Sequence, residues 1–376
     1  MSTKAMRGIV LVALLAAAVP AAASFRASDL IYIPAVSHTS GAAGSEWRTD
    51  LYITNVDDVD IDVMMVYLPS GITNNAALMN DRTYWLGGRE SDGFGFIDER
   101  LADIPPSGTV VLHDVVGEYW ADNPGLAGNG AMIVFASEAG SLDPDGNRVY
   151  KNAIAYARIY NQTQIWEQDP EDETVFTQAD TTYGQVMPGV PWYDLGDPAV
   201  VDQPTDPDAT PAYNFSVELL QGAQENADYR FNFGIFNASD PQTQLTFEFR
   251  PYHADGTPFT DADGNVIRLV ASVPPLNHLQ YFQILRNVLG IEDDVTEVLV
   301  RVTVLSWDTT SPDAVAAFTT YGSVIDNVSN DPTTLLPSFL DPYNVECVWA
   351  FGDKSGSTAP PPGRLSRRPV EIPPVR

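Results

Sequence analysis

Hydrophobic and polar residues alternate with a period of two along several short stretches of this chain. Between residues 47 and 54, Trp, Thr, Leu and Ile occupy one set of positions, while Arg, Asp, Tyr and Thr occupy the other. This alternation is typical of a β-strand with one face in a core. Residues 63–68 are instead apolar throughout, and further apolar runs occur at 30–36, 131–136 and 153–159. We expect each of these runs to form a strand.

Turn-forming residues separate these runs. An acidic segment at 57–62, Pro-Ser-Gly at 69–71 and the sequence IPPSG at 104–108 each adjoin a predicted strand. Asp-Gly at 145–146, between two apolar runs, is a strong short-range indication of a β-hairpin. Helical periodicity is scarce, so the pattern predicts an all-β fold built from packed sheets.

One stretch of the chain returns in altered form. Residues 33–55, IPAVSHTSGAAGSEWRTDLYITN, are similar to residues 217–237, VELLQGAQENADYRFNFGIFN. In both, an apolar strand leads to a Gly-containing loop, an aromatic-Arg pair and an alternating strand that ends in Asn. The numbering offset is constant, since 230 − 48 and 237 − 55 are each 182. We interpret the following motif residues as structural: Trp47, Arg48, Asp50 and Asn55 in the first copy, and Tyr229, Arg230 and Asn237 in the second.

Later segments repeat in the same order, and the Pro-Pro turn at 104–106 returns at 273–275. The sequence therefore predicts two tandem antiparallel β-sandwich domains of immunoglobulin-like type, related by internal duplication. We place the first domain at residues 29–165 and the second at residues 214–350.

Two further segments are expected to lie outside these domains. Residues 166–213 are acidic and rich in Pro, which predicts an extended linker. Residues 353–376 carry Pro and Arg without apolar periodicity, which predicts a disordered tail. Cys347 is the only cysteine, so an internal disulfide is excluded. We expect a buried thiol there, with an interchain bond as the alternative.

Residues 1–24 have the three-part pattern of a secretory signal peptide. Lys4 and Arg7 precede an apolar run at 9–19, and small residues follow up to Ser24. An uncleaved anchor is the alternative interpretation. No later stretch approaches the roughly 20 apolar residues that span a bilayer, so we expect no membrane span after cleavage. We expect an exported protein, located outside the cell, on its surface or in the periplasm.

The charge of the chain narrows the range of partners. Twenty Lys and Arg residues stand against fifty Asp and Glu residues, giving a formal net charge of −30. Such a surface repels phosphate backbones, so we exclude nucleic acid as a partner.

The repeated segments resemble a known type of repeat. The segments IPAVSHTSGAAGSEWRTDLYITN, TTYGQVMPGVP and YGSVIDNVSNDPTTLLP resemble a repeat of uncharacterised exported bacterial proteins, which opens with an IPxxxH, Gly-rich, WRTDLxxxN pattern. The resemblance implies a β-sandwich on an exported protein and carries no catalytic residues with it. The second copy lacks the His and the Thr-Asp pair, so a site built on those residues would exist only once.

Motifs of catalysis are missing from the sequence. The four histidines are His38, His113, His253 and His278, and none belongs to an HExxH pattern. No GxSxG nucleophile elbow occurs. Close pairs of carboxylates are expected by chance among fifty acidic residues, so they do not identify a glycoside hydrolase. We therefore assign no catalytic residue and no cofactor other than calcium.

Calcium is the best candidate for a small ligand. Two turns place oxygen donors at alternate positions around a Gly, which is the donor type that hard cations prefer. Both lack the terminal Glu of an EF-hand loop, and as ordinary hairpin turns they need no ion. The candidate ligands are Asp143, Asp145, Asn147, Asp261, Asp263 and Asn265.

Tryptophans outside the strand-like runs are candidate platforms for stacking a sugar ring. They are Trp85, Trp120, Trp166 and Trp192. Trp47 and its counterpart Tyr229 are instead expected to be buried anchors of the two sandwiches.

The function that these observations predict is that of an exported, non-catalytic pair of β-sandwich modules. It would serve cell-surface structure, adhesion or ligand binding, with an extracellular protein or a glycan as partner. A secreted hydrolase with carboxylate chemistry and a calcium-dependent glycan-binding protein are the alternatives.

Overall fold

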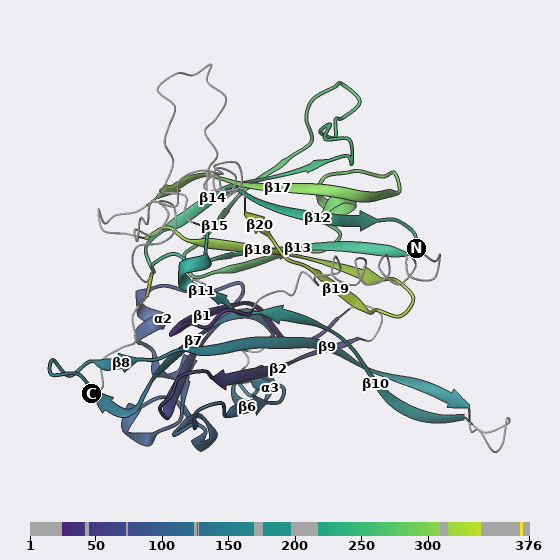
Figure 1. The fold of residues 1–376 in the computed structure, drawn as a ribbon. Coiled ribbons are helices and arrows are strands. Elements are labelled where there is room, and N and C mark those ends of the chain that lie inside the picture. Colours follow the sequence, from purple (N-terminus) through teal and green to yellow (C-terminus); the bar gives the residue numbers. More distant parts are fainter. Residues whose placement is uncertain are drawn as a thin grey trace, which may run out of the picture.

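A computed structural model describes residues 25–41, 45–72, 74–123, 126, 128–168, 176–196, 217–308, 315–339 and 369–370. Antiparallel strands dominate, and the helices are short. The strands form two bodies that lie against each other (Figure 1). We call residues 25–196 the first half and residues 217–339 the second half.

The first half is a two-layered β structure. One layer has the strand order β10-β9-β2-β6, and the other has the order β1-β7-β3-β4-β5. Strand β1 joins the layers, because it pairs with β7 along most of its length and with β2 at Thr39 and Ser40. The strands are β1 (Leu30–Ser40), β2 (Glu46–Asn55), β3 (Ile61–Pro69), β4 (Trp85–Gly87), β5 (Phe96–Ile97), β6 (Thr109–Leu112), β7 (Gly128–Leu142), β8 (Arg148–Tyr150), β9 (Ala153–Gln168), β10 (Phe176–Pro188) and β11 (Val190–Pro191).

Short helices connect these strands. Helix α2 (Ala76–Asn80) is capped by the Asn75 side chain, and α3 (Val115–Trp120) follows β6. The single-turn helices are η2 (Arg82–Tyr84), η3 (Glu90–Asp92), η4 (Glu99–Leu101) and η5 (Trp192–Asp194).

The second half repeats the two-layered plan. Its sheets have the orders β19-β18-β13-β16 and β15-β14-β17-β12-β20. The elements are β12 (Val217–Glu225), β13 (Tyr229–Asn237), β14 (Gln244–Tyr252), β15 (Leu269–Val273), β16 (His278–Tyr281), η6 (Ile284–Val288), β17 (Val295–Asp308), β18 (Phe318–Asp326), β19 (Pro332–Leu335) and β20 (Ser338–Phe339).

The two halves pair their strands in the same order. The layer β10-β9-β2-β6 corresponds to β19-β18-β13-β16, and β1-β7-β3-β4 corresponds to β12-β17-β14-β15. The predicted all-β fold is confirmed. The immunoglobulin-like detail is not: with β12 to β18 lettered A to G, the sheets are D-C-F-A and E-B-G, whereas an immunoglobulin constant domain has A-B-E-D and C-F-G. The B–E and C–F pairs are common to both, but A, D and G lie in the other sheet.

The two motif asparagines occupy equivalent places. The Asn55 side-chain amide donates to the Ile104 carbonyl at 2.8 Å, at the start of the first Pro-Pro turn. The Asn237 amide donates to the carbonyls of Val273 and Pro274, both at 3.0 Å, at the second such turn. Both side chains are fully buried. Each asparagine therefore joins the end of a strand to the same turn of its own half, as a structural residue.

Replacing Asn237 by Asp is expected to destabilise the protein strongly. The buried amide would become a carboxylate that faces carbonyl oxygens, and a buried group without its partner costs about 1–3 kcal/mol, more if it is charged. Chemical denaturation at pH 7 measures the change, and Asn55→Asp is the matched variant in the first half. A variant as stable as the parent would contradict the structural role.

Each half has its own core, and a third core is shared between the halves. Residues such as Leu51 and Ile53 lie between the layers of the first half, and Phe231 and Phe233 between those of the second. The third cluster combines first-half residues with Phe236, Ala238, Leu276 and Ala317 of the second half. The halves are therefore packed together and not merely tethered.

The shared core explains why residues 63–68 are apolar throughout. Val63 and Met65 face the core of the first half, whereas Met64 and Val66 face the shared core. Strand β3 is consequently buried along its whole length. A strand covered on both faces loses the alternation of polar and apolar residues.

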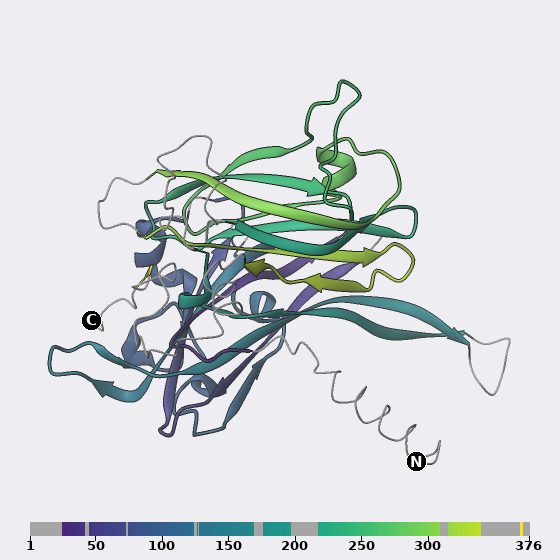
Figure 2. The same cartoon turned by 45° about the horizontal axis from the view of Figure 1, so that its top comes forward.

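The segment predicted to be an extended linker is partly built into the fold. Residues 176–188 form β10, which pairs with β9 in a long hairpin that projects from the body (Figures 1 and 2). β11 pairs with β1, and Leu195 is buried in the shared core. The Pro-rich composition misled the prediction, because Pro188 and Pro191 are the last residues of β10 and β11, where a missing N–H is tolerated.

Several predictions concern residues that the structure does not describe. The signal peptide at 1–24, Cys347 and nearly all of the tail at 353–376 are among them. Within the tail, Pro369 and Val370 are described, and Val370 is buried in the shared core. No helix in the described part of the chain is long and apolar enough to cross a membrane.

Candidate binding site between the two halves

The outward face of β13 forms the floor of the site. Phe231, Phe233 and Ile235 point into the core of the second half. Because side chains alternate along a strand, Arg230 and Asn232 point the other way, toward the first half. Register places Ile325 beside Arg230 and Ser323 beside Asn232 on β18, and these side chains share the outward face.

The contact between β13 and the first half becomes looser from Phe236 toward Arg230. Phe236 is fully buried and lies against Tyr32 of β1, with 5.9 Å between the ring centroids. Two residues earlier, Gly234 leaves room for the Tyr321 ring, which a Cβ at this position would strike. Beyond Tyr321 the halves separate and leave a cavity over Asn232 and Arg230.

His278 closes the inner end of the cavity. Its Nδ1 lies 3.0 Å from the Ser70 hydroxyl of the first half, and its Nε2 lies 2.7 Å from the Tyr321 hydroxyl. Burial lowers the pKa of this histidine to about 4, so the ring is neutral at pH 7. A neutral imidazole has one donor and one acceptor nitrogen and satisfies both hydroxyl contacts. The arrangement lacks the carboxylate that orients the imidazole in a Ser-His-Asp triad.

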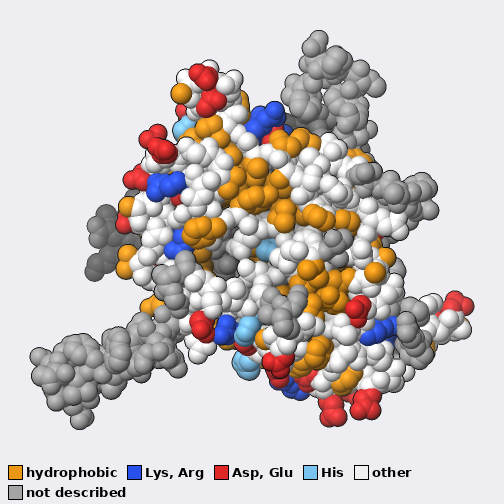
Figure 3. Space-filling view, turned by 180° about the vertical axis from the view of Figure 1, so that it is seen from behind, with side chains coloured by type: hydrophobic (Ala, Val, Ile, Leu, Met, Phe, Trp, Pro, Cys, Tyr) orange, Lys and Arg blue, Asp and Glu red, His pale blue; other side chains and the backbone are white. Residues whose placement is uncertain are grey.

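The cavity has a volume of about 520 Å³, within the range of pockets that hold small organic ligands. The first half contributes Thr39 of β1 and Trp47 of β2, and β10 contributes Gln185. Figure 3 shows one face of the molecule, on which apolar side chains gather over the middle while acidic and basic side chains lie mostly toward the edges.

Gln185 connects the projecting hairpin to the second half. Its Oε1 accepts hydrogen bonds from the hydroxyls of Ser323 and Thr334, both at 3.0 Å. The Thr334 hydroxyl also lies 3.0 Å from the Val186 carbonyl. These bonds hold β10 against β18 and β19, so the wall of the cavity is cross-linked between the halves.

Arg230 is the one charged side chain among the described residues that line the cavity. Its residue exposure is 8%. Its terminal nitrogens donate to the amide oxygens of Asn327 at 2.9 Å and Asn330 at 2.8 Å. Nε is buried and has no hydrogen-bond partner in the described part of the chain. Burial lowers the pKa of Arg230, while the charge of Asp326 opposes this change; a guanidinium still stays protonated at neutral pH.

The described part of the cavity lining is poor in ionisable side chains. Among the described residues, the lining includes no Asp, Glu, Cys or Lys. Glycoside hydrolysis normally needs two carboxyl groups, which this cavity does not offer. What the lining does offer is one cation, several hydroxyl and amide groups, and the indole of Trp47.

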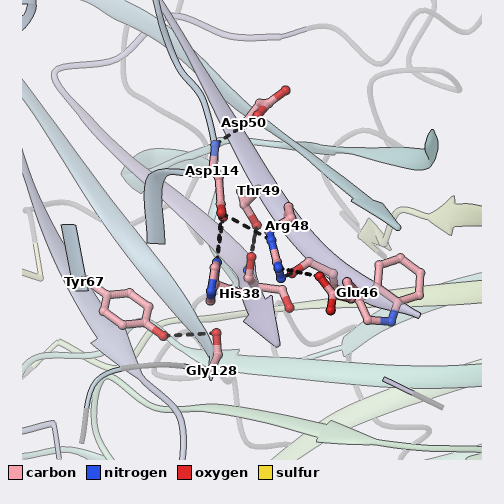
Figure 4. A network of polar contacts seen from close by, with 10 residues as sticks. His38, Glu46, Arg48, Thr49, Asp50, Tyr67, Asp114 and Gly128 are labelled. Carbon is pink, nitrogen blue, oxygen red and sulfur yellow. Dashed lines mark hydrogen bonds and ion pairs between the residues drawn. The ribbon is translucent and has the colours of Figure 1, made fainter. Parts of the chain in front are cut away.

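The opening motif forms a separate network on the first half (Figure 4). The Asp114 carboxylate lies 2.9 Å from His38 Nδ1 and 3.3 Å from Arg48 Nε. Arg48 also pairs with Glu46 at 2.7 Å, and the Asp50 carboxylate accepts the Asp114 backbone N–H at 3.1 Å. The motif thus gathers its charged residues around Asp114, where they compensate one another.

Asp114 was not singled out from the sequence, although the motif surrounds it. It adopts a left-handed conformation with φ 42° and ψ 50°, which Asp tolerates better than most residues. At Gly117, one turn later, a Cβ would strike both His38 and Asp114. In the sequence, Asp114 and Gly117 are recognisable only as the start of a helix with a Gly nearby. That pattern is too common to identify a site.

The paired aromatic residues of the motif are less buried than expected. Trp47 and Tyr229 are both partly exposed, although each packs against the core of its own half. The reason is positional, because each lies within the first two residues of its strand. Trp47 faces the cavity there and joins the core at its edge.

Two of the predicted stacking tryptophans are core residues. Trp85 and Trp120 are fully buried, and their indole N–H groups donate to the carbonyls of Met79 at 3.0 Å and Thr83 at 3.2 Å. Their position outside long apolar runs misled the prediction, since short elements cover them. Trp192 is partly buried, with its N–H donating to Asp29 at 3.1 Å. The Trp166 side chain lies outside the described residues.

The two candidate calcium loops are hairpin-type turns. The Asp143 carboxylate accepts the backbone N–H groups of Asp145 at 2.9 Å and Asn147 at 2.7 Å. The Asp261 carboxylate accepts those of Asp263 at 2.9 Å and Asn265 at 2.8 Å. The geometry accounts for both turns without an ion, and calcium binding stays a prediction. No group of three or more His, Cys, Asp or Glu side chains in the described segments is arranged so that it could hold a metal ion.

Other residues of the cavity were beyond sequence reasoning. Gln185 and Tyr321 lie within the segments TTYGQVMPGVP and YGSVIDNVSNDPTTLLP, but the sequence assigned them no role, and His278 belongs to no motif. Arg230 was recognised only as a structural repeat of Arg48. No protein-family model matches the chain, and no curated protein matches it.

Proposed function

We propose that this chain is an exported, non-catalytic binding protein whose ligand occupies the cavity between its two halves. The observation that carries the proposal is the composition of the cavity wall. Both halves and the hairpin strand β10 contribute to it, and the joint is held by His278 and Gln185. Because both halves form the wall of this cavity, the ligand site exists only when the halves are packed together.

The type of lining supports binding of a small, partly apolar molecule. Pockets for such ligands combine apolar walls with a few placed polar groups. Here Trp47, Ile325 and Phe282 supply apolar surface, while Asn232 and Gln280 supply amides. Trp47 is the tryptophan at this cavity, so it takes the stacking role that the sequence suggested for others.

The proposal includes an origin for the two halves. Their common strand order and the equivalent asparagines support internal duplication of one sandwich. Export rests on the sequence pattern of residues 1–24. The proposal places the protein outside the cell, on its surface or in the periplasm, with an extracellular protein or a glycan as the partner.

Filling the mouth of the cavity tests the proposal. Thr39 lines the cavity and is partly exposed, so Thr39→Trp is expected to block entry with little effect on folding. Thr246→Trp is the matched control, because Thr246 lies on β14, outside the cavity lining. Thermal-shift screening with sugars, aromatic acids and aliphatic amides should find compounds that stabilise the parent and Thr246→Trp.

The same compounds should lose at least about tenfold in affinity for Thr39→Trp, as measured by calorimetry. Equal affinity for both variants would show that the ligand binds elsewhere. Turnover of chromogenic glycosides or esters by the parent would contradict the non-catalytic part of the proposal.

A further inference from the structure

The two motif arginines have the same place in their halves but different surroundings. Arg48 has carboxylate partners, Asp114 at 3.3 Å and Glu46 at 2.7 Å. Arg230 forms no ion pair within 4.0 Å in the described part of the chain, and it donates to two neutral amides instead. The guanidinium charge is retained in the second half, where Asp326 acts on it from beyond ion-pair distance and no described carboxylate contacts it.

One of the two carboxylate partners of Arg48, Asp114, is lost by replacement in the second half. The Asp114 N–H donates to Asp50 at 3.1 Å, and the Gln283 N–H donates to Asn232 at 3.1 Å. Asp114 and Gln283 share the left-handed conformation, with φ 42° and 47°. Asn232 thus stands where the first half has Asp50, and Gln283 where it has Asp114. The backbone geometry is kept while two acidic side chains become neutral amides.

Burial explains the loss of the acids but not the retention of the arginine. The face of β13 is covered by the first half, and an unpaired charge is costly there. On that argument Arg230 would also be replaced. Instead it stays charged beside the cavity, 8% exposed and with Nε free of a partner among the described residues. A guanidinium without a carboxylate in contact is suited to bind the carboxylate of a ligand.

We propose that the ligand of this cavity is a small organic monocarboxylate, whose carboxylate pairs with the Arg230 guanidinium. This inference rests on the proposed function. A single cation balances a single negative charge, and the net charge of −30 disfavours multiply charged anions such as phosphates. The apolar part of the ligand lies against Trp47 and Ile325, with Asn232 and Gln280 available for its polar substituents.

Matched acid and amide probes test this inference. Phenylacetate and phenylacetamide have the same shape and differ in charge, as do indole-3-acetate and indole-3-acetamide. Calorimetric titration of the full chain at pH 7 and low salt should show each acid binding about tenfold or more tightly than its amide. Raising the salt concentration should reduce this preference, because the pair is electrostatic.

Variants of the two arginines assign the preference to its residue. Arg230→Gln should bind acid and amide alike, and Arg230→Lys should keep part of the preference. Arg48→Gln is the matched control and should behave like the parent, since Arg48 does not line the cavity. Circular dichroism of Arg230→Gln verifies its fold, and Arg230→Lys provides the charge-preserving comparison if that fold is lost.

The outcomes separate the two proposals. Acid preference in the parent that survives in Arg230→Gln overturns the assignment to Arg230. Equal binding of acid and amide by the parent overturns the monocarboxylate inference and leaves the proposed function standing. Binding of none of the four probes, together with no hit in the wider screen, overturns both.

Discussion

Replacing Phe236 by Ala is expected to lower the stability of both halves together. Phe236 belongs to the second half, yet it is fully buried in the shared core and lies against Tyr32 of the first half. Truncation of a buried Phe costs about 3–5 kcal/mol, a large part of the roughly 5–15 kcal/mol that stabilises a folded protein. Differential scanning calorimetry should show one transition for the parent. In Phe236→Ala, the melting transition should shift to lower temperature and split into two transitions, one for each half.

Phe247→Ala is the control for this prediction. Phe247 is also fully buried, but it belongs to the core of the second half. Its truncation should lower the melting temperature by a similar amount and leave a single transition, because the shared core is intact. Two well-separated transitions in the parent would contradict the packing of the halves as one cooperative unit.

Glu218 is expected to make the protein less stable as the pH rises from about 4.5 to about 8. Burial raises its pKa from 4.5 to about 8, although bonds from the N–H and hydroxyl of Thr320 oppose this. The folded state therefore retains a proton that the unfolded state releases. The stabilising contribution is complete below pH 4.5 and is lost as the pH passes through 8. A pKa that differs by one between the folded and unfolded states is worth about 1.4 kcal/mol, so roughly 4–5 kcal/mol is at stake.

His278 contributes the opposite trend over a lower range. Burial lowers its pKa from 6.5 to about 4, so the unfolded state binds the proton first. Its contribution is present above pH 6.5 and is lost as the pH falls through 4. Between pH 4.5 and 6.5 the two trends offset each other. Of these two groups, only Glu218 still loses its contribution between pH 6.5 and 8.

Urea denaturation at several pH values separates the two groups. Glu218→Gln should have nearly constant stability between pH 6.5 and 8, and above pH 8 it should be more stable than the parent. His278→Gln should lose less stability than the parent between pH 6.5 and 4. A parent whose stability does not fall between pH 6.5 and 8 would contradict the burial of a protonated Glu218.

The repeat shows how much of the fold the sequence predicts. Asn55 and Asn237, found by their constant offset, make the same hydrogen bonds to the two Pro-Pro turns. This was predictable because a strand end and a turn are local features, specified by neighbouring residues. The strand order was not, since the partner of β1 is β7, almost a hundred residues along the chain.

The candidate site was predictable only in part, for the same reason. Arg230 stands out in the sequence as the repeat of Arg48, but its lack of a carboxylate partner follows from Asn232 and Gln283, which only the fold brings near it. Trp85 and Trp120 lie near turns, and short elements bury them. Neither the burial of a side chain nor its distance from a carboxylate is a local property of the sequence.

The sequence by itself indicated the all-β fold, the repeat and the acidic composition of this protein. It also indicates which strand faces are covered by other parts of the chain. Met64 and Val66 of β3 are apolar. The equivalent residues of β14, Thr246 and Glu248, at the same offset of 182, are polar. Only the tertiary structure decided what covers β3, because an apolar strand face is satisfied by any apolar surface. The cavity, and the place of Arg230 beside it, result from the packing of the second half against the first.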